Sequence, residues 1–420
     1  MSSIIAPGPH GEPWRQRALI ALIVLCWAVG ALPQIAKYLS GTALIAATLA
    51  GAIVVLATVK LVLRSPSEPR PVRPLAWLCG FWLAMLLLYL VLYPLSQRHT
   101  VGIGSDAEDA LRVAALQLTR LSYPYSAHTY IGNPITPLPG AILLALPFEP
   151  LGRVGLQNIF WLTVLIVLCT EWLGDWLKAL GFLMVMSLED LVSVDQFVTG
   201  GDYTVNTWYV CAAVMLFLGA HASARSVALR LGTAVLLGVT LSSRLVYPIV
   251  IVPLLAAYLA RRRGPRAATL CLLTPLIVAI GITVPFYLYD PAQFAPLHVQ
   301  QKLLFLPRAE AQAVLIGLPL AAALVACSGF LVHLTLARIF LIAGVASSTI
   351  LLLPSVLMLL QTPVSQFNWQ LLSYANASAT FVALWAFQAL SPLKPRAREF
   401  RLLQRLCLAP VPASTQSMPP

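Results

Sequence analysis

The sequence has 420 residues, of which 59% are hydrophobic and only 10% are charged, and its formal net charge is +12. Ordinary soluble domains carry about 25% charged residues, so this composition excludes a soluble fold. Repeated runs of about 17 to 22 mainly apolar residues match the roughly 30 Å hydrocarbon core of a bilayer. A spanning backbone must satisfy its own hydrogen bonds, so continuous runs predict an all-α polytopic integral membrane protein.

The positive charge is a topological signal and does not indicate nucleic-acid binding. Basic residues fall in loops that alternate along the chain: Arg15 and Arg17, 64–73, Arg225 and Arg230, 261–266, Arg338, and the tail 394–420. Such loops face the cytoplasm in plasma-membrane proteins. We therefore expect a multi-pass plasma-membrane protein with cytoplasmic N- and C-termini. The seven cysteines form no CxxC pair or metal-type spacing, which favours reduced, buried thiols.

Twelve membrane spans are predicted from the apolar runs. They are 18–39, 41–63, 75–96, 155–172, 179–197, 204–221, 231–241, 246–260, 268–289, 313–333, 339–360 and 377–393. An even number is what two cytoplasmic termini require. Residues 138–151, broken by Pro147, are then a re-entrant half-helix; alternatively they cross and 179–197 stays at the outer surface. The sequence leaves both arrangements open.

No internal repeat and no Walker or dinucleotide-binding glycine motif divides the chain, which predicts one integral membrane domain over residues 1–420. Within it we distinguish the first three helices (18–96), an outer loop (97–152), the remaining helices (153–393) and a cytoplasmic tail (394–420). An outer location of 97–152 follows from the cytoplasmic assignment of the basic loop at 64–73.

Acidic residues open the polar part of the outer loop. Ser105, Asp106, Glu108 and Asp109 precede apolar residues at 111, 114, 115, 118 and 121, a spacing typical of an amphipathic helix. Ser105 with Glu108 resembles a capping box, and first-turn acids suit the helix dipole. Capping leaves Asp106 and Asp109 as candidates for a general base.

A Pro- and Gly-rich loop, SYPYSAHTYIGNP, follows that helix. Tyr123, Tyr125, Tyr130 and His128 have two interpretations, as an interfacial aromatic belt or as groups that stack on and hydrogen-bond a sugar. Gly132, Asn133, Pro134 and Pro137 are typical of turns.

Four further acids, Glu189, Asp190, Asp195 and Asp202, lie within or beside apolar sequence, where carboxylates are functional candidates. The alternative is an exposed turn at residues 200–202. Arg244 lies at the tip between 231–241 and 246–260, at or beyond mid-membrane, and therefore needs an anionic partner, either one of these acids or a phosphate. The later outer loop contributes His298, Lys302 and Arg308, which are cationic binding groups or surface residues.

A carboxylate combined with cations near lipid suits glycosyl transfer from a lipid phosphate. The acceptor hydroxyl needs a base, and the departing phosphate needs cations.

The chain resembles the GT-C superfamily of multispanning glycosyltransferases, which use polyprenyl-phosphate-linked sugars, and within it the mannosyltransferase-like branch. The similarity lies in SDAEDA, LTRLSYPYSAHTYIGNPITPLPGAILLALPFEPLG, TGGDYTVN, GVTLSSRLVYPIVIVP and VPFYLYDPAQF, in this order over roughly half the chain. The chain departs from many members in an additional helix pair before the acidic loop and in having no sizeable soluble domain after the last helix.

The resemblance implies inverting transfer on the outer face, with Asp106 as catalytic aspartate and Asp109 beside it. It implies that Arg244, and also Lys302, meet the donor phosphate. Other expected substrate contacts are Tyr125, His128, Tyr130, Asn133, Asp202 and His298. Relatives differ in using a divalent ion such as Mg²⁺ or Mn²⁺, which leaves metal binding by Asp106, Glu108 and Asp109 open. The expected acceptor is a lipid, a glycan or a protein.

Two other functions fit a chain of this kind. A transporter or flippase would explain intramembrane acids and broken helices. A non-catalytic protein of envelope assembly would tolerate replacement of Asp106 at the cost of helix capping alone.

Overall fold

The computed structural model describes residues 13–64, 73–98, 106–223, 226–298, 303, 306–361, 372 and 374–390. These residues form helices and connecting turns without a strand, as the composition predicts. The first half contains α1 (Pro13–Tyr38), α2 (Gly41–Arg64), α3 (Arg73–Ser96), α4 (Ala107–Thr119), α5 (Pro139–Ala145), α6 (Leu156–Leu173), α7 (Trp176–Leu183), a π-turn (Met184–Leu188) and α8 (Leu191–Thr199).

The second half contains α9 (Tyr203–Ser223), α10 (Val227–Leu241), α11 (Val246–Arg263), α12 (Pro265–Tyr289), α13 (Arg308–Cys327), α14 (Leu336–Leu351), α15 (Leu353–Gln361) and α16 (Asn376–Ala389). Short 3₁₀ turns cover Pro124–Ser126, Leu146–Leu151, Ala295–Leu297 and Ser328–Phe330.

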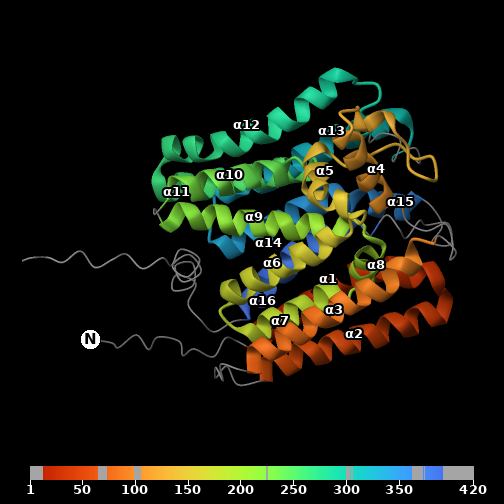
Figure 1. The fold of residues 1–420 in the computed structure, drawn as a ribbon. Helices are drawn as coiled ribbons and strands as arrows, with labels where there is room; N and C mark the ends of the chain where they lie inside the picture. Colours follow the sequence, from red (N-terminus) through yellow and green to blue (C-terminus); the bar gives the residue numbers. More distant parts are fainter. Residues whose placement is uncertain are drawn as a thin grey trace, which may run out of the picture.

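The long helices lie side by side in one bundle, with α12 at one edge and α2 at the other (Figure 1). α9 lies inside and packs on α6, α8, α10 and α16. Its apolar residues are largely buried, whereas those of α2 and α12 are mostly exposed. Leu61 on α2 is 68% exposed and Leu270 on α12 is 70% exposed. Apolar side chains outside and inside the bundle are what a lipid environment requires.

Eight helices in the described part of the chain are long and apolar enough to cross a membrane, so the expected twelve are not confirmed. They are Trp14–Tyr38, Gly41–Arg64, Leu75–Ser96, Leu156–Leu173, Tyr203–Ala222, Pro265–Tyr289, Arg308–Phe330 and Leu336–Gln361. Of the other four expected spans, α10 has 15 residues and α16 has 14, and α11 ends in three arginines. The last expected residues, 391–393, lie outside the described residues.

The prediction of a continuous helix over 179–197 is wrong. The chain forms α7 and the π-turn, leaves helical geometry at Asp190, and starts again as α8. The physical cause is capping, because the Asp190 carboxylate accepts hydrogen bonds from the amides of Val192 and Ser193. Residues 138–151 form α5 and a 3₁₀ turn, too short to cross and consistent with the expected half-helix.

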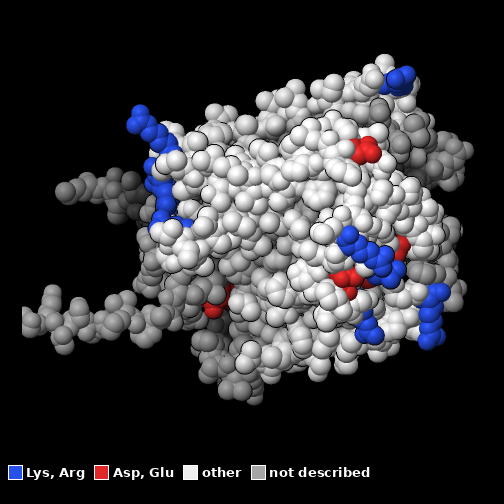
Figure 2. Space-filling view, turned by 45° about the horizontal axis from the view of Figure 1, so that its top comes forward, with Lys and Arg blue, Asp and Glu red and all other residues white. Residues whose placement is uncertain are grey.

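The bundle has two polar ends. α4 and α5 lie at the end opposite the beginning of α1 and the turn between α11 and α12 (Figure 1). On the face shown in Figure 2, charged side chains gather toward the two ends and leave a broad uncharged middle. This separates the acidic loop from the arginines of 261–266, as the alternation of basic loops predicts.

Candidate functional site

Asp106 holds the loop 128–134 at the beginning of α4 through side-chain hydrogen bonds. Its Oδ2 atom accepts hydrogen bonds from Thr129 Oγ1 at 2.9 Å and from Asn133 Nδ2 at 2.8 Å. Within the loop, the Thr129 amide donates to the Asn133 carbonyl at 2.9 Å, and Gly132 turns the chain with a φ of 83°. A positive φ favours glycine there, which explains the Gly-Asn pair as turn chemistry.

Asp109, three residues after Asp106 and within the first turn of α4, binds the same loop. Its Oδ2 accepts the Tyr130 amide at 2.7 Å, and its Oδ1 pairs with Arg112 at 2.9 Å. The pair is separated by three residues on one helix face, and Arg112 is half exposed, so its contribution to stability is small. Both acids therefore shape the loop.

Glu108 points elsewhere, into the packing between α4 and α3. Its Oε1 accepts the Tyr93 hydroxyl at 2.5 Å, and the residue is 2% exposed. Burial raises the pKa of the Glu108 carboxyl, opposed by the hydrogen bond from Tyr93 and the charge of Arg112. This contact differs from the expected capping box, whose Ser105 lies outside the described residues. Leu121, expected on the apolar face, lies beyond α4 and is 96% exposed.

The three carboxylates at the start of α4 have two environments: Asp106 and Asp109 bind the loop 128–134, whereas Glu108 packs against α3. Throughout the described residues, no group of three or more His, Cys, Asp or Glu side chains could hold a metal ion. In the structure Asp106, Glu108 and Asp109 each hydrogen-bond other protein groups.

An ion pair joins α9 to the turn between α10 and α11. Arg244 Nη2 lies 2.6 Å from both carboxylate oxygens of Asp202. The side chain of Asp202 is 3% exposed and that of Arg244 is 22% exposed. The guanidinium also lies 5.3 Å from the ring centre of Tyr203, a cation–π distance. Arg244 therefore has the acidic partner that its depth in the bundle requires.

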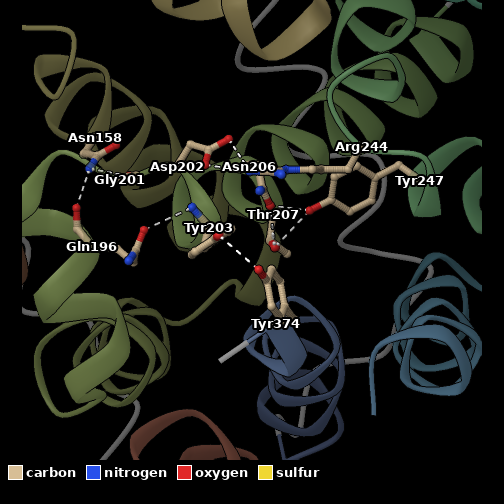
Figure 3. Close-up of polar contacts among 10 residues, drawn as sticks. All are labelled: Asn158, Gln196, Gly201, Asp202, Tyr203, Asn206, Thr207, Arg244, Tyr247 and Tyr374. Atoms are coloured by element: carbon tan, nitrogen blue, oxygen red, sulfur yellow. Dashed lines mark hydrogen bonds and ion pairs between the residues drawn. The ribbon is translucent and has the colours of Figure 1, made fainter. Parts of the chain in front are cut away.

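The position of Asp202 is fixed by a buried turn (Figure 3). Asn158 Nδ2 donates at 3.1 Å to the carbonyls of Gln196 and Gly201, and Gly200 adopts a left-handed φ of 78°. Gly200, Gly201 and Asp202 are all buried, so the alternative of an exposed turn is wrong. The turn between α8 and α9 thus aims its carboxylate inward at Arg244.

α5 packs directly against the Arg244 turn. The Gly140 amide donates to the Ser242 carbonyl at 3.1 Å. A Cβ atom at Gly140 would lie 2.1 Å from the Val239 carbonyl oxygen, so only glycine permits this approach. The short helix therefore connects the acidic loop region with the arginine.

A cavity of about 980 Å³ opens between these elements. Its polar lining includes Arg244, Asn206, His128 and His298 and the tyrosines at 125, 203, 247 and 374. Its apolar lining includes Leu245, Val246 and Ile249 beside the arginine, Leu315 and Leu318 of α13, and Ile350 of α14. The cavity combines a polar end with an apolar wall, a chemistry that suits an amphipathic ligand.

The expected site residues separate into three groups. Arg244, Tyr125, His128 and His298 line the cavity, whereas Asp106, Asp109, Tyr130, Asn133 and Asp202 do not. Lys302 lies outside the described residues. Tyr125 is buried and donates to the Pro137 carbonyl at 3.0 Å, and burial raises the pKa of its hydroxyl well above its usual range. This tyrosine supports the loop that carries His128.

Sequence reasoning missed Asn206, Tyr247, Tyr203 and Tyr374 at the polar end of the cavity. Asn206 follows Asp202 by four residues at the start of a largely apolar helix, a spacing that places both on one face. Tyr247 follows Arg244 by three residues on entering α11. These spacings were the available signal. Tyr374 offered none, since its contact with Tyr203 at 3.4 Å depends on the tertiary fold.

The other acids near α8 have separate environments. Glu189 accepts Thr58 Oγ1 at 2.6 Å, and Asp190 accepts Ser193 Oγ at 2.5 Å and Asn376 Nδ2 at 2.9 Å. These contacts join α8 to α2 and α16. Asp202 alone among the four expected acids pairs with Arg244.

No protein-family model, curated protein or solved structure matches this chain.

Proposed function

We propose that the chain is a polytopic membrane glycosyltransferase that moves a sugar from a polyprenyl-phosphate donor to a lipid, glycan or protein acceptor. In this proposal the acidic loop faces the outer side of the plasma membrane. The observation that carries the proposal is the cavity of about 980 Å³, which combines Arg244 with an apolar wall from α13 and α14 beside an acidic loop. A lipid phosphate matches both parts, because its anionic head suits Arg244 and its hydrocarbon chain suits the apolar wall.

The residues divide the chemistry between them. Asp106 Oδ1 removes the proton from the acceptor hydroxyl, while Oδ2 stays bonded to Thr129 and Asn133. The acceptor oxygen forms a bond to the anomeric carbon, and the bond from that carbon to the phosphate oxygen breaks. The polyprenyl phosphate leaves with the electron pair, and Arg244 stabilises its charge. Attack from the side opposite the leaving group inverts the anomeric configuration.

Asp106 does not line the cavity, but its two loop partners are adjacent to residues that do. Thr129 follows His128, and Asn133 precedes Pro134, and both neighbours line the cavity. His128 and Pro134 are paired across the loop. The proposal therefore requires only that an acceptor enter beside this loop.

The test uses purified full-length protein in nanodiscs, polyprenyl-phosphate sugars of several kinds and a membrane lipid extract as acceptor. Wild type should release polyprenyl phosphate from one donor, and Asp106→Asn should release none. Glu149→Gln is the matched acid control, since Glu149 lies in the 3₁₀ turn Leu146–Leu151 away from the cavity lining.

Folding of each variant is checked by its unfolding temperature. Equal release by wild type and a folded Asp106→Asn protein would refute the role of Asp106. Movement of a lipid phosphate across the bilayer of liposomes that contain the protein, without cleavage, would identify a flippase instead.

A further inference from the structure

Asn206 lies at the polar end of the cavity, one helical turn after Asp202 on α9. It is 4% exposed and lines the cavity with Arg244 and Tyr247. Figure 3 shows its amide between the ion pair and the Tyr247 ring. A buried side-chain amide needs partners for both its oxygen and its nitrogen.

The amide oxygen of Asn206 is occupied. The hydroxyl of Tyr247 donates to Oδ1, and Thr207 Oγ1 donates to the same atom at 3.3 Å. Tyr247 and Thr207 also contact each other at 3.2 Å, and both are buried. Two donors at the oxygen set the orientation of the amide, so the nitrogen is the end that faces away from them.

The neighbouring arginine also presents donors. Its Nη2 atom binds Asp202, and the guanidinium lines the cavity with 22% of the side chain exposed. Within the described lining of the cavity there is no Asp or Glu. A phosphate brings acceptor oxygens that match these donors, whereas an ammonium group would meet a guanidinium and no free carboxylate.

We infer that Asn206 is a second head-group-binding residue, which donates its amide N–H to phosphate beside Arg244, and that Tyr247 positions it. The inference rests on the proposed function for the nature of the ligand, a lipid phosphate. It adds which head group the cavity selects. The cavity takes lipids with a phosphate head and rejects lipids of the same chain with an ammonium head.

The experiment measures binding of radiolabelled farnesyl phosphate to the full-length protein in nanodiscs, with farnesol and farnesyl amine as competitors of the same chain. Wild type should bind the phosphate roughly tenfold or more tightly than the alcohol, and the amine most weakly. Asn206→Asp should abolish this preference, because it replaces a donor by an anionic acceptor.

Tyr247→Phe separates positioning from a purely structural role. It should weaken farnesyl phosphate binding severalfold and farnesol binding clearly less, because an oriented amide donor contributes more to binding a charged phosphate than to binding a neutral hydroxyl. Tyr289→Phe, on the exposed end of α12, is the matched tyrosine control and should change neither.

Retention of the full phosphate preference by Asn206→Asp, or an equal loss of phosphate and alcohol binding in Tyr247→Phe, would overturn the inference. Binding requires no sugar transfer, so the two proposals fail separately. A protein that transfers sugar but whose preference ignores Asn206 rejects the inference alone. A protein with the expected preference that cleaves no donor rejects only the glycosyltransferase.

Discussion

Arg244 and Asp202 meet 42 residues apart in sequence, with Nη2 2.6 Å from each carboxylate oxygen. Asp202 directly precedes α9, and Arg244 lies in the turn between α10 and α11, so the pair fixes the polar end of the cavity. The carboxylate is buried, and its pairing offsets the cost of placing either charge inside an apolar bundle.

Replacing Asp202 by Asn should destabilise the fold, because it leaves the guanidinium without its anion. Removing one member of a buried pair costs roughly 3–5 kcal/mol, and the partial exposure of Arg244 places this case at the lower end. The double variant Asp202→Asn with Arg244→Gln removes both charges and should recover part of the loss. Unfolding in detergent with increasing dodecyl sulfate measures all three proteins. Equal stability of wild type and Asp202→Asn would contradict the prediction.

Glu108 should make stability depend on pH. Its pKa is raised in the folded protein, chiefly by burial, so the folded chain holds this proton more tightly than the unfolded chain. The stabilising contribution is complete below the ordinary glutamate pKa and is lost as pH rises through the raised value. Glu108→Gln keeps an acceptor for Tyr93 and should flatten this part of the profile. Unfolding midpoints between acidic and neutral pH give the comparison, and an unchanged slope would exclude Glu108 as its cause.

The helices could be predicted where apolar runs are long and their ends carry turn or basic residues. The helix at 41–63 is an example, since α2 covers Gly41–Arg64. The prediction failed over 179–197, because Asp190 offers its carboxylate to two backbone amides and ends the helical run. A hydropathy average over the segment hides a single residue of this kind. Capping depends on whether the side chain or the helix backbone supplies the hydrogen-bond acceptor for the local amides.

The residues of the candidate site were predicted only in part, because some of their contacts are local in sequence and others depend on the tertiary fold. Arg244 is recognisable because a charge at that depth needs a partner. Which of several acids pairs with it depends on how α9 packs beside α10, and sequence spacing does not contain that information. The contacts of Asp106 with Thr129 and Asn133 likewise need the closed loop, although Gly132 and Asn133 indicate the turn itself.

Gly140→Ala should destabilise the protein by pushing α5 away from the turn that carries Arg244. The added Cβ would lie 2.1 Å from the Val239 carbonyl oxygen and 2.7 Å from the Ser242 carbonyl carbon, and backbone atoms cannot yield as a side chain does. We expect a loss of roughly 1–3 kcal/mol, typical of overpacking. Gly232→Ala on α10 is the matched control, because its Cβ meets nothing within 4 Å. Thermal unfolding of the two variants and the wild type in detergent gives the comparison. Equal unfolding midpoints would show that α5 can move away from the Arg244 turn without loss of stability.

Asn133→Ala should separate the structural role of Asp106 from its proposed catalytic role. The variant removes one of the two hydrogen bonds to Asp106 Oδ2 and retains both the carboxylate and Thr129. A hydrogen bond to a charged group contributes about 1.5–3 kcal/mol to stability, so its loss should make the loop more mobile while the protein stays folded. We expect sugar transfer to fall severalfold in Asn133→Ala and to vanish in Asp106→Asn, because only the second removes the base. Transfer rates at saturating donor provide the measurement. If both variants lost the same fraction of activity, Asp106 would act by holding the loop, and the general base would have to be sought among other residues.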